Sequence, residues 1–262
     1  MNEHEVYPNA PVVLVALEIR HPAADPLTRP DRRAIKNLLG GDRFIMRTSQ
    51  MLNVQIAGQV AQQVGNGEEV ARFLDRQSTT VVTLHTEGMT VETTRYQGWE
   101  AFRALARTVF DARQEVAPVD GYERVGLRFF SEIRDPESNW SEWVDGSLLG
   151  PHSKRPIDLD LAQWQGVTVY GSQPGRALVL RHGPRDGYVV DPNGELKQPN
   201  RGASGPFFLL DIDSFWTRSD ELPMFKPADV EDFCNELHTP IRTLFEGLIT
   251  DQLREAMRHA RD

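Results

Sequence analysis

The chain has 262 residues, of which 39% are hydrophobic and 26% charged, values typical of a globular protein with a sizeable core. The formal net charge of −9 argues against a general nucleic-acid binder, because such proteins neutralise phosphates with Lys and Arg. No apolar run approaches the roughly 18 to 20 residues of a membrane helix, and the N-terminus does not look like a signal peptide, so we expect no membrane association and a cytoplasmic location.

The first half predicts strands, a short helix, a β-hairpin and a long helix. Residues 12–20 are nearly all apolar and β-branched, which predicts a buried strand. A short helix starting near Pro30 ends at Gly40-Gly41, and residues 44–56 are expected to be strand-like. Residues 59–69 predict a loop or a frayed helix. A hairpin is expected at 79–86 and 89–95, followed by a helix over 97–114 that lies across it.

The second half predicts a meander and a C-terminal helix. A strand at 125–134 is followed by a connection that includes residues 148–156, which we expect to be exposed. Four further strands are predicted, separated by turn sequences: 167–170, 177–181, 188–190 and 206–215. Residues 227–258 predict one kinked helix or two consecutive helices, with the interruption at Thr239-Pro240.

Two segments of the chain echo each other. Glu18-Ile19-Arg20 and Glu132-Ile133-Arg134 close two predicted strands, and strands and then a helix follow each of them. We therefore expect an α+β fold, with a largely antiparallel sheet from two similar halves and long amphipathic helices packed on one side. The halves are residues 1–120 and 121–262, as two units or one continuous domain.

Two Asp-x-Asp pairs are candidates for cation binding: Asp158 with Asp160, and Asp211 with Asp213. Residues i and i+2 of a strand share a face, so each pair could present two carboxylates to one metal ion. The alternative is that Leu210, Ile212 and Phe215 fill the core while the carboxylates face water or pair with arginines. We prefer that alternative, and keep a metal-dependent hydrolase or nuclease using Asp211 and Asp213 as the second hypothesis.

Three arginines alternate along the predicted strand at 125–134. Arg124, Arg128 and Arg134 share one face and could form the basic stripe of a nucleic-acid-linked regulator, despite the acidic total, and Arg124 and Arg128 are candidate contacts for a ligand or partner. The alternative is cross-strand pairing with Glu residues, which we prefer.

Trp140 and Trp143 lie three residues apart in a polar stretch, where tryptophan often marks a contact with a ligand or protein. The competing interpretation, which we slightly favour, is that they anchor a long loop to the core. Cys234 is the single cysteine and lies on the apolar face of a predicted helix, so a buried thiol is expected. The seven histidines lack zinc-ligand spacing, and no nucleotide-binding motif is present, so no cofactor or metal is expected.

Several segments together resemble a sporadically distributed bacterial family of uncharacterised proteins of about this length. They are the start at 7–11 (YPNAP), the helix start at 96–102, the strand at 124–130 (RVGLRFF), the strand at 209–213 (LLDID) and the helix segment at 237–246 (LHTPIRTLFE). Phe129, Phe130 and Ser131 depart from the family's usual Tyr-Ile-Asn-like continuation. The family's patchy distribution implies an accessory component of a bacterial defence or toxin-related system.

These observations favour a non-catalytic binding or assembly protein over an enzyme. We expect it to hold a protein partner or a small ligand through a sheet groove or the loop around Trp140 and Trp143, with nucleic acid disfavoured and homo-oligomer formation left open.

Overall fold

The computed structural model describes residues 7–51, 54–57, 60–63, 68–150, 164–199 and 201–259, and in them nine strands form one antiparallel sheet while two more form a hairpin. The strands are β1 (Val12–Arg20), β2 (Phe44–Met51), β3 (Val54–Ala57), β4 (Val60–Gln63), β5 (Glu68–Asp75), β6 (Thr80–His85), β7 (Gly88–Thr93), β8 (Arg124–Arg134), β9 (Gly166–Gln173), β10 (Arg176–Asp186) and β11 (Pro206–Thr217). The helices are α1 (Arg29–Leu38), α2 (Trp99–Val116), α3 (Pro227–Leu248) and α4 (Asp251–Arg258), with short 3-10 turns η1 (Gly41–Arg43), η2 (Trp140–Glu142) and η3 (Gly146–Leu148).

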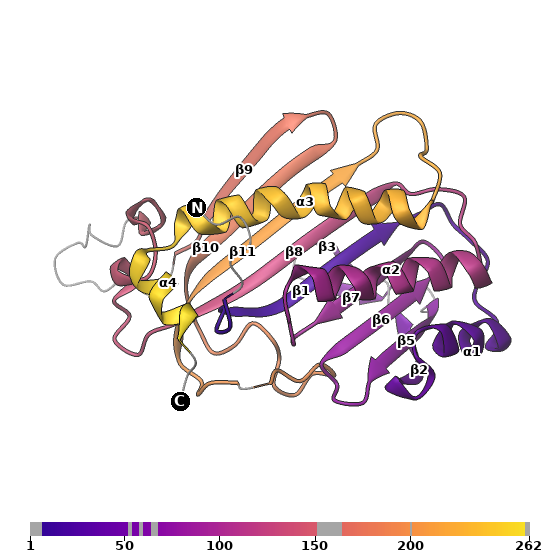
Figure 1. The fold of residues 1–262 in the computed structure, drawn as a ribbon, viewed down its shortest axis with the longest axis horizontal. Helices are drawn as coiled ribbons and strands as arrows, with labels where there is room; N and C mark the ends of the chain where they lie inside the picture. Colours follow the sequence, from indigo (N-terminus) through magenta and orange to yellow (C-terminus); the bar gives the residue numbers. More distant parts are fainter. Residues whose placement is uncertain are drawn as a thin grey trace.

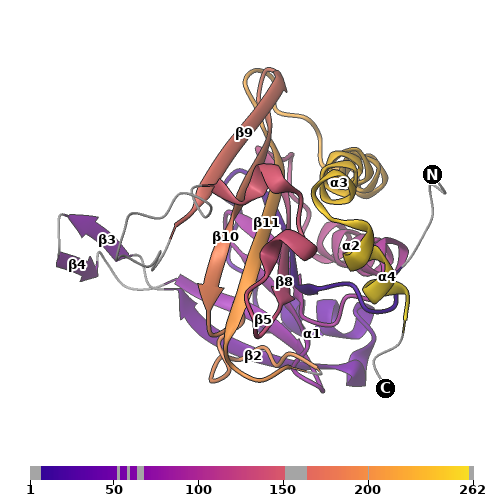
Figure 2. The same ribbon diagram turned by 90° about the vertical axis from the view of Figure 1, so that its left-hand side faces the viewer.

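The sheet runs in the order β2-β5-β6-β7-β1-β8-β11-β10-β9, and β1 pairs antiparallel with β8 near its centre, where Leu17 lies opposite Leu127. Strands from both predicted halves therefore belong to one sheet. Helices α2 and α3 lie side by side across it (Figure 1), and Figure 2 shows α2, α3 and α4 together on one face. The α+β class and the antiparallel sheet are confirmed. We call the face opposite α2 and α3 the second face.

Alternation of buried residues explains why the central strands form. In β1, Val13, Val15, Leu17 and Ile19 are buried against the helices, whereas the residues between them lie on the second face and are partly exposed. In α2 the buried positions recur every three or four residues, which places one stripe of the helix on the sheet. The strand predicted at 12–20, the hairpin β6–β7 and the helix α2 are all confirmed.

The C-terminal segment forms two consecutive helices, but the break is not where the sequence predicted it. Pro240 lies inside α3, and the chain leaves the helix at Ile249. Thr250 then caps α4 by accepting a hydrogen bond from the backbone N–H of Leu253, while its hydroxyl donates to the carbonyl of Glu142. A tertiary contact, which sequence periodicity does not reveal, therefore sets the boundary between the helices. On α3, Cys234 is buried as expected, and burial raises the pKa of its thiol.

Two local predictions are wrong. Residues 60–63 form β4 and residues 68 and 69 begin β5, where a loop or frayed helix was expected over 59–69. Residues 188–190 form no strand. They belong to the β10–β11 loop, which we define as residues 187–205. Most of the connection predicted at 148–156, and the pair Asp158 and Asp160, lie outside the described residues, although Leu148 is buried.

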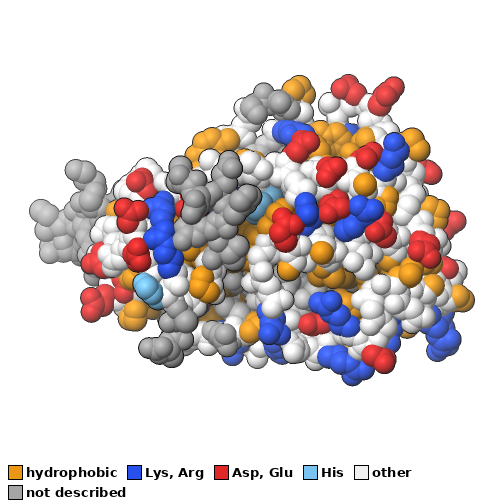
Figure 3. Space-filling model, in the orientation of Figure 1, with side chains coloured by type: hydrophobic (Ala, Val, Ile, Leu, Met, Phe, Trp, Pro, Cys, Tyr) orange, Lys and Arg blue, Asp and Glu red, His pale blue; other side chains and the backbone are white. Residues whose placement is uncertain are grey.

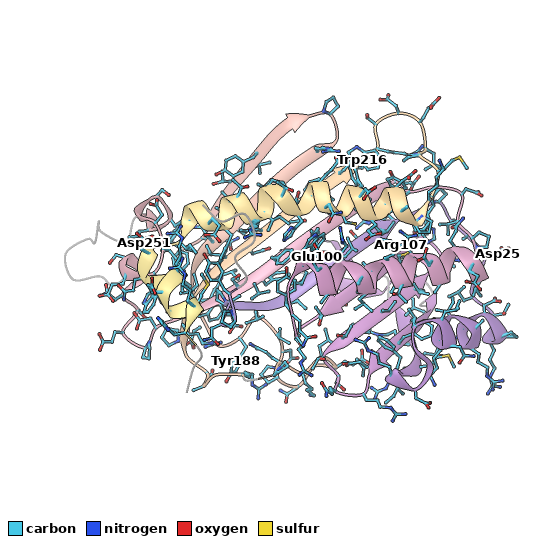
Figure 4. All side chains as sticks on the ribbon, viewed as in Figure 1. Asp25, Glu100, Arg107, Tyr188, Trp216 and Asp251 are labelled. Carbon is cyan, nitrogen blue, oxygen red and sulfur yellow. The ribbon has the colours of Figure 1, made fainter. Side chains whose placement is uncertain are left out.

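The β10–β11 loop is tied to one end of the sheet by hydrogen bonds. The backbone N–H of Val189 donates to Glu132 at 2.6 Å, and that of Lys197 donates to the carbonyl of Ser78 at 2.6 Å. Further along, Glu195 forms an ion pair with Arg72 at 2.6 Å. The loop, marked by Tyr188 in Figure 4, therefore runs from β8 to the far strands β5 and β6.

Charged side chains of both signs lie intermixed over the outer surface of α2 and α3 (Figure 3). Some of them join the two helices, because Arg107 on α2 pairs with Glu231 on α3 at 2.9 Å (Figure 4). Among the described residues, no helix combines the length and the apolar character needed to cross a membrane.

A histidine between the two long helices is expected to make stability depend on pH. His238 stacks on Trp99 with ring centroids 4.2 Å apart, and burial, assisted by Arg242, lowers its pKa to about 4. The imidazole of His238 is protonated near pH 6.5 in the unfolded state but only near pH 4 in the folded state. The free energy of unfolding therefore falls as the pH drops through that window, by at most about 3 kcal/mol.

Urea denaturation from pH 8 to pH 4 of the wild type and His238→Phe, which keeps a ring on Trp99, measures this contribution. The difference in unfolding free energy between the two proteins should be constant above about pH 7.5 and move in favour of the variant below about pH 6.5. Parallel pH profiles for the two proteins would contradict the assignment.

Candidate functional site

Two sets of predicted site residues meet on the second face of the sheet. Arg124 and Arg128 lie on β8, Asp211 and Asp213 lie on β11, and the register places Asp213 directly opposite Arg128. Neighbouring strands add further charged residues to this face. We define the sheet-face cluster as Glu18, Arg124, Arg128, Arg181, Asp211 and Asp213.

Arg128 and Asp211 form the central ion pair of the cluster. The guanidinium donates from Nε and Nη2 to the two carboxylate oxygens, at 2.7 and 2.6 Å, a bidentate geometry that fixes both groups. The same guanidinium lies over the ring of Phe130, 4.5 Å from its centroid. The Asp211 side chain is 4% exposed and that of Arg128 is 37% exposed, so the pair presents its cationic side to solvent.

Asp213 and Arg181 extend the cluster toward β10. Nη1 of Arg181 lies 3.7 Å from Asp211 Oδ2 and 4.0 Å from Asp213 Oδ2, and this buried nitrogen has no hydrogen-bond partner among the described residues. Burial raises the pKa of Asp213, and the nearby arginines only partly oppose this.

Arg124 is held at the other end of the cluster. It pairs with Glu18, which also accepts from Arg20 at 3.0 Å, and its guanidinium lies 4.9 Å from the ring centroid of Phe215. Gly126 makes this arrangement possible, because a Cβ at that position would collide with the Arg124 guanidinium. Arg134, the third arginine of the predicted stripe, pairs with Glu132 and donates to the β10–β11 loop. Arg124 thus has the cross-strand glutamate that the pairing alternative predicted, whereas Arg128 pairs across strands with an aspartate and Arg134 pairs with a glutamate of its own strand.

The arrangement is poorly suited to a cation at Asp211. Both of its carboxylate oxygens already accept hydrogen bonds from Arg128, and a metal ion there would lie beside several guanidinium groups. In the described part of the chain, His, Cys, Asp and Glu form no group of three or more that could ligate a metal. Nη1 of Arg128 has no hydrogen-bond partner among the described residues, so the cluster is better suited to an incoming acceptor such as a carboxylate.

The two tryptophans predicted as contact residues occupy different environments. Trp140 is 3% exposed, and its ring lies 5.8 Å from that of Phe208, so it belongs to the core and offers no surface to a partner. Trp143 is half-buried and donates from Nε1 to Asp135 at 3.2 Å. Core anchoring, the second interpretation given above, describes Trp140.

Sequence reasoning missed two residues of the cluster, Glu18 and Arg181, and the two aromatic rings that lie against its arginines, Phe130 and Phe215. Phe215 was expected in the core with Leu210 and Ile212. It lies two residues after Asp213 on β11, so its side chain is on the same face as those of Asp211 and Asp213. Strict alternation along β11 would have found it. Glu18 and Arg181 lie on other strands, and only the register of the sheet brings them to the site.

No protein-family model and no curated protein sequence matches this chain. The roles of the residues at the sheet-face cluster are therefore inferred from their contacts alone.

Proposed function

We propose that this protein is a non-catalytic binding protein that docks an acidic protein partner on the second face of its sheet. The observation that carries the proposal is the partly exposed side chain of Arg128, whose guanidinium is held by Asp211 and Phe130 and has Nη1 available to an acceptor. An arginine fixed in this way binds a carboxylate with little loss of side-chain entropy.

Apolar residues flank the charged cluster on the same face. Val169 lies opposite Val179, which lies opposite Asp213, and Val167 lies opposite Arg181. The two β9 valines are 59% and 64% exposed. Arginine and aromatic side chains beside an exposed apolar strip are typical of protein interfaces.

The edge position of β9 supports the same proposal. Within the described residues this strand pairs only with β10, so its other edge can accept an extended segment of the partner by strand addition. The partner we propose therefore has an extended apolar segment next to an acidic side chain.

We also infer that the two halves derive from one repeated unit. β1 and β8 each pair with the last strand before a long helix, β7 before α2 and β11 before α3. Glu18 with Arg20 and Glu132 with Arg134 form ion pairs at corresponding positions of the two strands. Glu132 and Arg134 bind the β10–β11 loop, whereas Glu18 of the first pair belongs to the sheet-face cluster.

Site-specific photo-crosslinking in the source organism tests the docking surface. A photoreactive residue at Val167 should capture one discrete adduct, whereas the same residue at Tyr170, 47% exposed on the opposite face of the same strand, should not. Once the captured protein is purified, Val169→Asp should bind it about tenfold or more weakly than Val169→Lys does, because both variants lose the apolar side chain but only aspartate repels an acidic partner.

Two results would overturn the proposal. One is equal capture from Val167 and Tyr170, and the other is equal affinity of the Val169→Asp and Val169→Lys variants for the captured protein. Val167, Val169 and Tyr170 are all exposed, so the substituted proteins should fold, and circular dichroism checks this.

A further inference from the structure

A second site lies on the helix side of the sheet, at the end where the β10–β11 loop is attached. A cavity of about 490 Å³ opens there between the start of α2 and the ends of β5, β6 and β7. Its wall carries three arginines: Arg43 at the end of η1, Arg76 after β5 and Arg95 after β7. We call this cavity the arginine pocket.

The three arginines have no acidic partner among the described residues. Arg76 donates from Nε to the backbone carbonyl of Asp42, and Arg95 donates to the side-chain amide of Gln77, so both are oriented by neutral acceptors. All three are exposed. This contrasts with the sheet-face cluster, where every arginine lies against a carboxylate.

The one carboxylate on the wall of the arginine pocket is already engaged. Asp75 accepts from the backbone N–H of Thr79 at 2.6 Å, from its hydroxyl at 2.9 Å and from the backbone N–H of Thr80 at 3.0 Å. These bonds shape the turn between β5 and β6. Asp75 therefore orders the wall, and its single charge offsets only part of the positive charge of the three arginines.

Two aromatic residues and the start of a helix complete the site. Tyr96 and Phe102 line the pocket with ring centroids 6.5 Å apart, and the Tyr96 hydroxyl has no hydrogen-bond partner among the described residues. Burial raises the pKa of this phenol, so it remains a donor. Ala101, in the first turn of α2, also lines the cavity, and no side chain caps this helix. In Figure 4 the first turn of α2 is marked by Glu100.

We propose that the arginine pocket binds a small molecule that carries phosphate groups and a planar ring, such as a nucleoside phosphate. Guanidinium groups match phosphate oxygens in bidentate geometry, and an uncapped helix start favours an anion. The volume lies within the range of small-molecule sites, and the partly exposed ring of Tyr96, backed by the buried Phe102, offers a surface for stacking. The pocket lies on the other side of the sheet from the sheet-face cluster, so this proposal is independent of the docking function.

Calorimetric titration of the full chain with inorganic pyrophosphate and with ADP tests the proposal. Both should bind saturably, and ADP more tightly than pyrophosphate because only ADP carries a ring. Arg76→Ala and Arg95→Ala should each weaken binding on the order of tenfold. Arg33→Ala removes an equally exposed arginine from α1, outside the pocket, and should leave both affinities unchanged.

The proposal is overturned if neither probe binds saturably, or if Arg33→Ala weakens binding as much as Arg76→Ala does. Val169→Asp, the docking variant, should bind both probes like the wild type. Failure of the arginine pocket and failure of the docking surface therefore give different results.

Discussion

Replacing Trp140 with alanine is expected to lower the free energy of unfolding by about 4 kcal/mol. The indole is 3% exposed and contacts the core beside Phe208, so its removal leaves a large cavity that the surrounding strand cannot fill. Urea denaturation followed by circular dichroism measures the loss without relying on tryptophan fluorescence. The variant should also melt at a clearly lower temperature.

Trp143→Ala is the matched control, three residues further along the same loop. Its half-buried side chain would lose the hydrogen bond to Asp135 and some packing, so we expect a loss of about 1 to 2 kcal/mol. If Trp140→Ala cost no more than Trp143→Ala, Trp140 would not be the core anchor of this loop.

The strand β1 was predicted from its nearly unbroken apolar run, although only alternate residues of it are buried. Periodicity predicted the long helix α2 correctly, because only one stripe of it is buried and its sequence shows the period of three to four. β5 was missed because this condition fails there. Its residues Ala71 and Phe73 face the helices, while Leu74 is buried on the second face, so the strand does not alternate.

Four residues of the sheet-face cluster, Arg124, Arg128, Asp211 and Asp213, were predicted, but not as a unit. Arg128 was considered for a basic stripe and Asp211 for a metal site, because each pattern was read along a single strand. The two residues are 83 positions apart, and the pairing of β8 with β11 makes them neutralise each other. Which strands become neighbours depends on the tertiary packing of the whole sheet, which local sequence does not encode.

The arginine pocket gave no sequence signal for a related reason. Arg43, Arg76 and Arg95 come from three separate connections, and none of them belongs to a recognisable motif. Surface arginines are usually solvated or paired, so single positions carry no information about a ligand. Only the closure of the sheet ends around the start of α2 brings the three together.

Replacing Arg128 with methionine is expected to lower the free energy of unfolding by about 3 kcal/mol, because it leaves the Asp211 carboxylate buried with only the more distant Arg181 as a partner. Asp211→Asn should cost less, about 1 kcal/mol, since the exposed Arg128 can then turn toward water and the amide still offers an acceptor.

A double-mutant cycle measures the coupling directly. The double variant Arg128→Met with Asp211→Asn removes both charges, so it should be more stable than Arg128→Met alone. Urea denaturation at neutral pH gives all four unfolding free energies. Additive losses, or a larger loss for Asp211→Asn than for Arg128→Met, would mean that Asp211 is not held by Arg128. The carboxylate would then be available to a cation, and a rise in melting temperature with magnesium that disappears in Asp211→Asn would support the hydrolase hypothesis in place of the docking surface.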